Sequence, residues 1–256
     1  MRLVHRYIQY ILIPFALALF LILWQLIVVV NQLPPYILPT PMQVATSLIE
    51  NWGNGIIPRH LGLTLFEVGL GFSIALSFAM IVGYLLAKSP LLEKIVSPYI
   101  VATQSVPIIA IAPLIIIWIK TGPVQNALIA ALITFFPMLV NTIVGLRNIR
   151  PEYHELMRSY AANPWQVLIK LEAPAALPIF FGGVRVGITL SVIGVIVVEL
   201  LWADRGFGFL LNFARGQLDT PLLFATVATL SAMAISLYVI VVILERILVR
   251  WRRKAE

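Results

Sequence analysis

The chain has 256 residues, of which 61% are hydrophobic and only 11% are charged. Soluble domains carry about 25% charged residues, so this composition excludes an ordinary soluble protein and predicts a polytopic membrane protein. The absence of cysteine excludes disulfide frameworks and thiolate metal sites. The net charge of +7 forms no folded basic patch, which argues against nucleic-acid binding.

Long apolar runs define the expected membrane-spanning helices, because about 20 apolar residues cross a bilayer. The first run, Ile11 to Val30, is too long for a signal-peptide core and no small-residue cleavage site follows it, so we expect a retained span. Thr40 and Pro41 then predict the start of a short surface helix over 41–52. Further spans are expected over 64–87, 91–119, 124–146, 182–202 and 224–249, the second of these with a lead-in helix and a break at 104–107.

The predicted domains are an N-terminal span and outer loop (1–63), a transmembrane domain (64–249) and a basic cytosolic tail (250–256). Six spans place both termini on the same side of the membrane. With the N-terminus in the cytosol, 14 Lys and Arg residues face the cytosol and 4 face outward, a strong positive-inside bias. The basic tail is then expected to meet anionic lipid head groups.

Residues 147–178 (RNIRPEYHELMRSYAANPWQVLIKLEAPAALP) interrupt the apolar pattern with a long polar segment. A polar segment between spans must lie in water or against protein. Pro151 and Glu152 suit the first turn of a helix, and Asn163 with Pro164 predicts its end and the start of a second short helix. The apolar side chains of this loop need a covering surface, which is either the chain's own bundle or a partner protein.

The stretch from Glu155 to Gln166, together with Pro174 to Pro178, resembles the EAA loop of ABC-importer permeases, which reads E-A-A-x-x-x-G and later A-A-L-P. Other stretches agree in order and spacing: LPTPMQV, SVPIIAIAPLIIIW, FFPMLVNTIVGLRNI and ELLWADRGFGFLL. Within that family the chain is similar to the nitrate, sulfonate, taurine and vitamin-precursor branch. The resemblance implies an all-α fold, the six-transmembrane-helix fold of type I ABC importer permeases.

The same resemblance implies the partners and the site. Two coupling helices would dock on a cytosolic ABC ATPase dimer, a solute-binding protein would deliver the substrate outside, and a second permease copy would complete a homodimer. The chain has no GxxxxGK[ST] phosphate loop, so it is expected not to be an enzyme and to need no cofactor, since the ATPase binds the ATP. The implied coupling residues are Glu152, Glu155, Arg158, Tyr160, Ala161, Ala162, Asn163, Pro174, Leu177 and Pro178.

The segment departs from the family pattern at the motif glycine, which is Ala161 here. Alanine adopts a left-handed backbone less readily than glycine, so we expect the bend to move to Asn163. Another departure is Glu67 in the second span, where relatives often carry an arginine or another polar residue.

Candidates for the translocation pathway are polar or aromatic residues expected within or near spans: Gln104, Ser105, Trp118, Asn141 and Glu199. For Glu67 and Glu199 the alternative is a paired structural role, with Arg205 or Arg215 as partners of Glu199. Gly183 and Gly187 form a GxxxG motif that permits close helix packing, within the chain or between two copies.

The predicted function is therefore that of a permease subunit importing a small organic solute, with a flat heteroaromatic vitamin (riboflavin or the thiamine pyrimidine precursor) preferred. The same machinery importing an alkanesulfonate, taurine or nitrate is the alternative. Two other classes are weaker. A secondary transporter usually needs intramembrane carboxylates or discontinuous helices in related halves, and a membrane enzyme needs clustered His, Asp or Glu residues.

Overall fold

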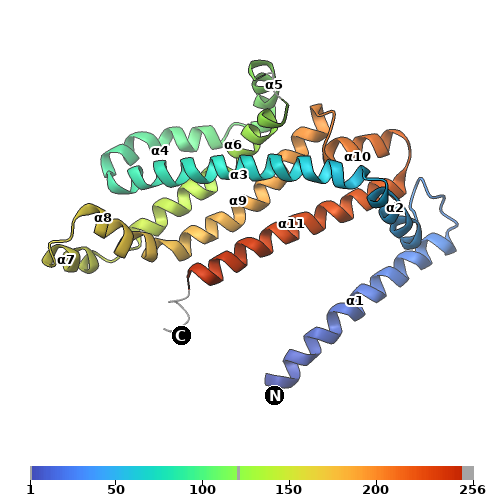
Figure 1. Cartoon of the computed structure of the whole chain (residues 1–256), viewed down its shortest axis with the longest axis horizontal. Coiled ribbons are helices and arrows are strands. Elements are labelled where there is room, and N and C mark those ends of the chain that lie inside the picture. The colour runs from blue at the N-terminus through green and yellow to red at the C-terminus, as the bar shows by residue number, and fades with distance from the viewer. Residues whose placement is uncertain (1, 120–121, 250–256) are drawn as a thin grey trace. The chain divides into compact units, whose positions relative to one another are not determined.

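The computed structural model describes residues 2–119 and 122–249, and the described residues form helices without strands (Figure 1). The predicted basic tail, 250–256, lies outside the described residues. The chain forms two compact units, Met1–His60 with Leu210–Leu230, and Leu61–Phe209 with Ser231–Glu256. The helices are α1 (Arg2–Val30), α2 (Pro41–Gly53), α3 (Ile56–Lys88), α4 (Pro90–Gln104), α5 (Ile108–Trp118), α6 (Gly122–Arg147), α7 (Pro151–Ser159), α8 (Pro164–Val167), α9 (Ala173–Trp202), α10 (Phe207–Gly216) and α11 (Thr220–Leu248), with a π-helix, η1 (Leu168–Glu172), between α8 and α9.

In the first unit, the short helix α2 begins where the sequence predicts. The Thr40 side chain accepts a hydrogen bond from the Gln43 backbone N–H, and the Gln43 side chain accepts one from the Thr40 N–H, which completes a capping box. The preceding proline-rich connection is held by Thr220, whose hydroxyl donates to the Tyr36 carbonyl at 2.7 Å. The short helix predicted over 41–52 is thus confirmed.

Four helical segments in the described part of the chain are long and apolar enough to cross a membrane. They are Ile56–Lys88, Gly122–Arg147, Pro164–Trp202 and Thr220–Leu248. The described apolar part of α1, Pro14–Val30, is shorter. The all-helical, multi-pass architecture predicted from the sequence is confirmed.

The span predicted over 91–119 is divided into α4, with 15 residues, and α5, with 11. The break at 105–107 lies where the sequence predicts it, because Pro107 cannot donate a backbone hydrogen bond. Neither piece alone reaches the length of about 20 residues that a span requires.

In the second unit, α6 and α9 run side by side and contact each other over much of their length (Figure 1). Small residues allow these two helices to approach each other closely. A Cβ atom on Gly183 would lie 2.6 Å from the Asn141 Cβ, and one on Gly187 would lie 3.2 Å from the Thr134 Cγ2. The predicted GxxxG motif therefore packs against α6 of the same chain, which answers the choice that the sequence left open.

Helix α3 packs against both α6 and α9 through similar contacts. A Cβ on Gly83 would lie 2.7 Å from the Thr142 Cβ of α6, so these helices touch almost backbone to backbone. Ala75 and Ala79 of α3 and Met138 and Leu139 of α6 form a fully buried cluster between them. The tight packing makes α3, α6 and α9 a framework on which the polar segment is mounted.

The close α6–α9 approach predicts that Gly183→Ala destabilises the protein. The added methyl group would collide with Asn141, and overpacking of this kind costs about 1–3 kcal/mol. The measurement is the thermal unfolding temperature in lipid nanodiscs. Gly69→Ala in α3 is the matched control, because open space surrounds that position. An unchanged or higher unfolding temperature for Gly183→Ala would contradict the packing described.

Candidate functional site

The polar segment presents an uncovered apolar surface. No residue of α7 or α8 is buried. Leu156 is exposed, and so are Tyr160 and Trp165, which have 77% and 67% of their surfaces accessible. Helix α7 starts at Pro151 and carries Glu152 in its first turn and Arg158 in its last, so its charges complement the helix dipole. The short helix therefore leaves these apolar side chains exposed.

The turn after α7 is made at Ala161, which has a left-handed backbone with φ of 48°. The expectation that the bend moves to Asn163 is therefore wrong. Asn163 is extended and caps α8, where its side chain accepts a hydrogen bond from the Gln166 N–H at 2.8 Å. The Ala162 N–H donates to the Met157 carbonyl at 3.0 Å, a bond that closes the helix end and helps to hold the strained alanine.

The second predicted short helix is not separate from the fifth span. α8 continues through η1 into α9, and together they form one helical segment, Pro164–Trp202. The reason lies at Pro174, which lacks the N–H for a normal helical bond one turn earlier. In the wider π turn the Ala173 N–H bonds to the Leu168 carbonyl, so the helix absorbs the proline without breaking. α8 and the span are thus parts of one continuous helical segment.

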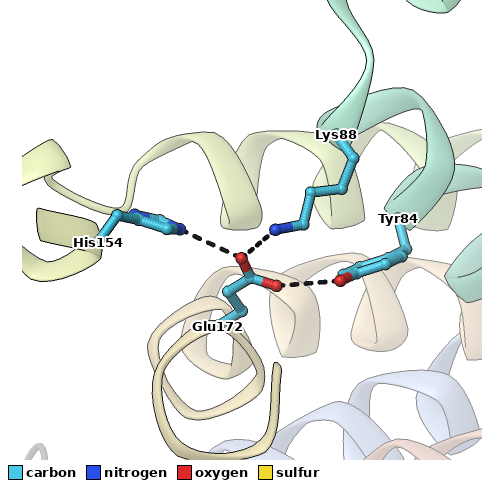
Figure 2. A network of polar contacts seen from close by, with 4 residues as sticks. All are labelled: Tyr84, Lys88, His154 and Glu172. Atoms are coloured by element: carbon cyan, nitrogen blue, oxygen red, sulfur yellow. Dashed lines mark hydrogen bonds and ion pairs between the residues drawn. The ribbon is translucent and has the colours of Figure 1, made fainter. Parts of the chain in front are cut away.

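The carboxylate of Glu172, at the end of η1, is the centre of a polar network (Figure 2). Its side chain is only 2% exposed. The Lys88 ammonium of α3 forms an ion pair with Oε1, His154 Nε2 of α7 lies 3.1 Å from the same oxygen, and the Tyr84 hydroxyl donates to Oε2 at 3.2 Å. One buried carboxylate therefore joins α7, α3 and the start of α9.

Two other ion pairs join helices of the second unit. Arg147, at the end of α6, pairs with Glu93 of α4. Arg185 of α9 pairs with Glu245 of α11, and its Nε donates to Glu245 Oε2 at 2.7 Å. Each ion pair joins two helices: the first ties the last residue of α6 to α4, and the second ties the middle of α9 to α11.

The structure brings most of the predicted coupling residues together. Seven of them, from Glu152 to Asn163, lie in α7 and the turn that follows, whereas three lie in the first turns of α9: Pro174, Leu177 and Pro178. Leu177 and Tyr84 line an apolar cavity of about 370 Å³ beside the Glu172 network. Among the described residues, no ion pair involves Glu155 or Arg158, so their charged groups point to solvent.

The predicted pathway residues do not form a single site. Asn141 lines a cavity of about 400 Å³ with Phe136, Pro137 and apolar side chains. Ser105 and Trp118 are exposed at the ends of α4 and α5 and are not among the residues that line this cavity. Glu199 is buried in a separate polar cluster. The side chain of Gln104 lies outside the described residues.

Sequence reasoning missed the role of Glu172 and of its partners Lys88 and Tyr84. The available signal was its position, since Glu172 is the last charged residue before the long apolar run that becomes α9. What the sequence did not contain was the π turn, which helps to set the direction of the side chain.

Comparisons with known proteins agree with this geometry. Residues 75–254 match the family model described as "Binding-protein-dependent transport system inner membrane component". The riboflavin transport system permease protein RibX of Chloroflexus aurantiacus is 44% identical, over 93% of this chain and 89% of its own length. The formylaminopyrimidine transport permease protein ThiX of Halalkalibacterium halodurans is 33% identical, over 86% of this chain and 88% of its own length.

Among solved structures, the inward-facing methionine ABC transporter MetNI aligns with a TM-score of 0.62 and 18% identity, covering 74% of this chain and 94% of the matched chain. That similarity shows the fold. The multi-pass helical architecture, the family-model match and the two relatives lead to the same conclusion: the chain belongs to the inner-membrane components of binding-protein-dependent transport systems, the permease subunits of ABC importers.

Proposed function

We propose that residues 151–167 receive the movement of a cytosolic ATPase dimer and that Glu172 transmits it to the membrane spans. The observation that carries this proposal is the Glu172 network, because one buried carboxylate is bonded to α7 and to α3 while it sits at the start of α9. A loop attached only by flexible chain would move without moving the spans. ATP is bound by the partner, and this chain needs no cofactor of its own.

The orientation that fits this role places the polar segment and both termini in the cytosol. The distribution of Lys and Arg supports it, with 14 on the cytosolic side and 4 outside. The exposed apolar residues of α7 and α8 support docking on protein, since exposed aromatic and leucine side chains on a polar loop favour a covering surface. A second copy of the chain forms the other half of the pathway.

The substrate that we propose is a flat heteroaromatic vitamin, with riboflavin preferred over a thiamine pyrimidine precursor. The 44% identity to the riboflavin permease over nearly the whole chain is the main support. The cavity at Asn141 also fits such a ring, because it has apolar walls, the Phe136 ring and one amide group. Sites of this composition bind flat organic solutes through apolar contact and a few polar groups that set orientation.

The charge reversal Glu155→Lys tests docking. We expect the subunit to insert normally but to lose copurification with the ATPase and to lose transport, because the exposed α7 surface changes sign at that point. Glu50→Lys, at an exposed position of α2, is the control, and its ATPase copurification should stay unchanged. Stoichiometric ATPase binding and normal transport by Glu155→Lys would refute the assignment.

Glu172→Gln tests transmission separately from docking. The amide keeps the size of the side chain but removes the charge that Lys88 and His154 face, and a hydrogen bond to a charged group is worth about 1.5–3 kcal/mol. We expect ATPase binding to persist while the number of ATP molecules hydrolysed per transported solute rises several-fold. Glu93→Gln, which removes an ion pair that does not reach α7, is the matched control.

The substrate proposal is tested by uptake of radiolabelled riboflavin into a flavin auxotroph that expresses the permease with its ATPase and binding protein. We expect the cells to take up the radiolabel. An excess of unlabelled riboflavin should abolish this uptake, and taurine should leave it unchanged. If the cells take up the formylated pyrimidine or a sulfonate and no riboflavin, the machinery stands but the substrate is reassigned.

A further inference from the structure

Helix α2 has an apolar side that the described part of the chain leaves uncovered. Met42 and Ile49 have 73% and 72% of their surfaces accessible, and Trp52 and Ala45 are exposed as well. These four residues follow one another at intervals of three and four positions, so they share one face of the helix. The proposed coupling route and substrate site use none of them, and this face therefore requires a separate explanation.

The remaining surface of α2 is divided between protein and water. On one side Ser47 is buried, and the Asn51 amide donates a hydrogen bond to the Ser47 carbonyl at 2.8 Å. On another side three exposed residues are polar, namely Gln43, Thr46 and Glu50. The helix thus has a protein side, a water side and a separate apolar side. This division is typical of a helix at the boundary between a protein, water and the apolar part of a bilayer.

Both ends of α2 are connected to helices that can cross the membrane. Before α2, the hydroxyl of Thr220, the first residue of α11, donates to the Tyr36 carbonyl at 2.7 Å. After α2, only Asn54 and Gly55 separate it from α3, which begins at Ile56. Since α3 and α11 are both long and apolar enough to span a bilayer, α2 lies close to the ends of two spans.

The side chains and charges around α2 match a lipid interface. Tyr36, before α2, and Trp52, near its end, are 56% and 44% exposed, and aromatic residues with a polar group collect where membrane and water meet. Glu50 is the single charged residue in the sequence 31–58, and it lies on the water side of α2. Without Lys or Arg, α2 is not attracted to anionic head groups, so apolar contact must hold it.

The same apolar side is less suited to a protein that binds and leaves. A reversible partner would return Met42 and Ile49 to water in every transport cycle, which is costly for large apolar side chains. Lipid covers such a surface at all times. The exposed Ile56 extends the apolar surface into the first residue of α3, whose span lipid must also cover.

We propose that α2 is an interfacial helix whose side formed by Met42, Ala45, Ile49 and Trp52 lies in the acyl chains of the bilayer, while Glu50 faces water. The occupant of this side is phospholipid. An α2 anchored in this way fixes the depth at which α3 and α11 end in the membrane. The inference depends on neither the substrate nor ATPase docking, and a reversed orientation of the chain would change only the leaflet that α2 enters.

Spin labels at neighbouring positions test the proposal, because the chain has no cysteine of its own. Ile49→Cys places a label on the apolar side and Glu50→Cys places one on the water side, both at exposed positions where the fold should tolerate it. The transporter is assembled with a cysteine-free ATPase in phosphatidylcholine nanodiscs. Collisions of each label with oxygen, which concentrates in acyl chains, are compared with those of a water-soluble nickel chelate. We expect the ratio of oxygen to nickel collisions to be several-fold higher at Ile49→Cys than at Glu50→Cys.

The other possible environments give different results. Equal ratios at the two positions, with frequent nickel collisions, would place the apolar side in water and overturn the proposal. Few collisions with either reagent at Ile49→Cys would show that a second copy of the chain covers this side. The measurement is then repeated with the solute-loaded binding protein added. Oxygen collisions at Ile49→Cys should stay unchanged, and their loss would assign the surface to the binding protein.

The charge of the lipid provides a second test. Because α2 contains no Lys or Arg, exchanging part of the phosphatidylcholine for phosphatidylglycerol should leave the collision ratio at Ile49→Cys unchanged. Met42→Cys, on the same side, should give the same result if the label at position 49 disturbs the helix. A ratio that becomes high only with anionic lipid would show that electrostatic attraction holds the helix, and it would contradict anchoring by the apolar side.

Discussion

The bonds to one carboxylate determine how the polar segment is attached to the membrane domain. Glu172 is almost completely buried, and an unpaired charge in such a place is costly, so its ion pair with Lys88 and its contacts with His154 and Tyr84 must form together. These partners come from α7 and α3, two helices that are distant from each other in the sequence. The direction of α7, and with it the placement of its exposed apolar side chains, follows from satisfying this carboxylate.

The need to satisfy buried acidic groups also applies to Glu67 and Glu199, whose partners are of a different kind. A bilayer provides no water for unsatisfied polar groups, so charges inside it must find partners in the protein. Glu172 lies where a lysine side chain can reach it. Glu199 accepts hydrogen bonds from the Gly208 N–H of α10 and the Thr64 hydroxyl, and Glu67 accepts from the Asn126 amide. In both cases the acid is a junction between helices, which gives movable elements definite points of attachment.

Much of the fold could be predicted from the sequence because its causes are local. Long apolar runs predicted the spans, Thr40 with Pro41 predicted the start of α2, and Pro107 marked the break between α4 and α5. The resemblance predicted the family. The apolar residues of α7 also indicated a surface that another surface would have to bury.

The errors and omissions came from tertiary geometry. The bend was expected at Asn163 because of its intrinsic preference, but the closing hydrogen bonds of α7 place it at Ala161. The second short helix was expected to be separate, yet η1 carries it through Pro174 into α9. The surroundings of Glu172, Glu67 and Glu199 depend on contacts between residues far apart in the sequence. Thr64 and Glu199 are 135 positions apart, Lys88 and Glu172 are 84 apart, and Asn126 and Glu67 are 59 apart. No local pattern contains that information.

The central claim is that the surface of α7 faces the ATPase in the cytosol. The chain has no cysteine, so a single Leu156→Cys substitution gives a unique reactive group. In intact cells and inverted vesicles that carry the complete transporter, the account predicts a cross-link from this cysteine to the ATPase. It also predicts labelling by a membrane-impermeant maleimide only in inverted vesicles stripped of the ATPase. Labelling from outside intact cells, with no cross-link to the ATPase, would contradict the account.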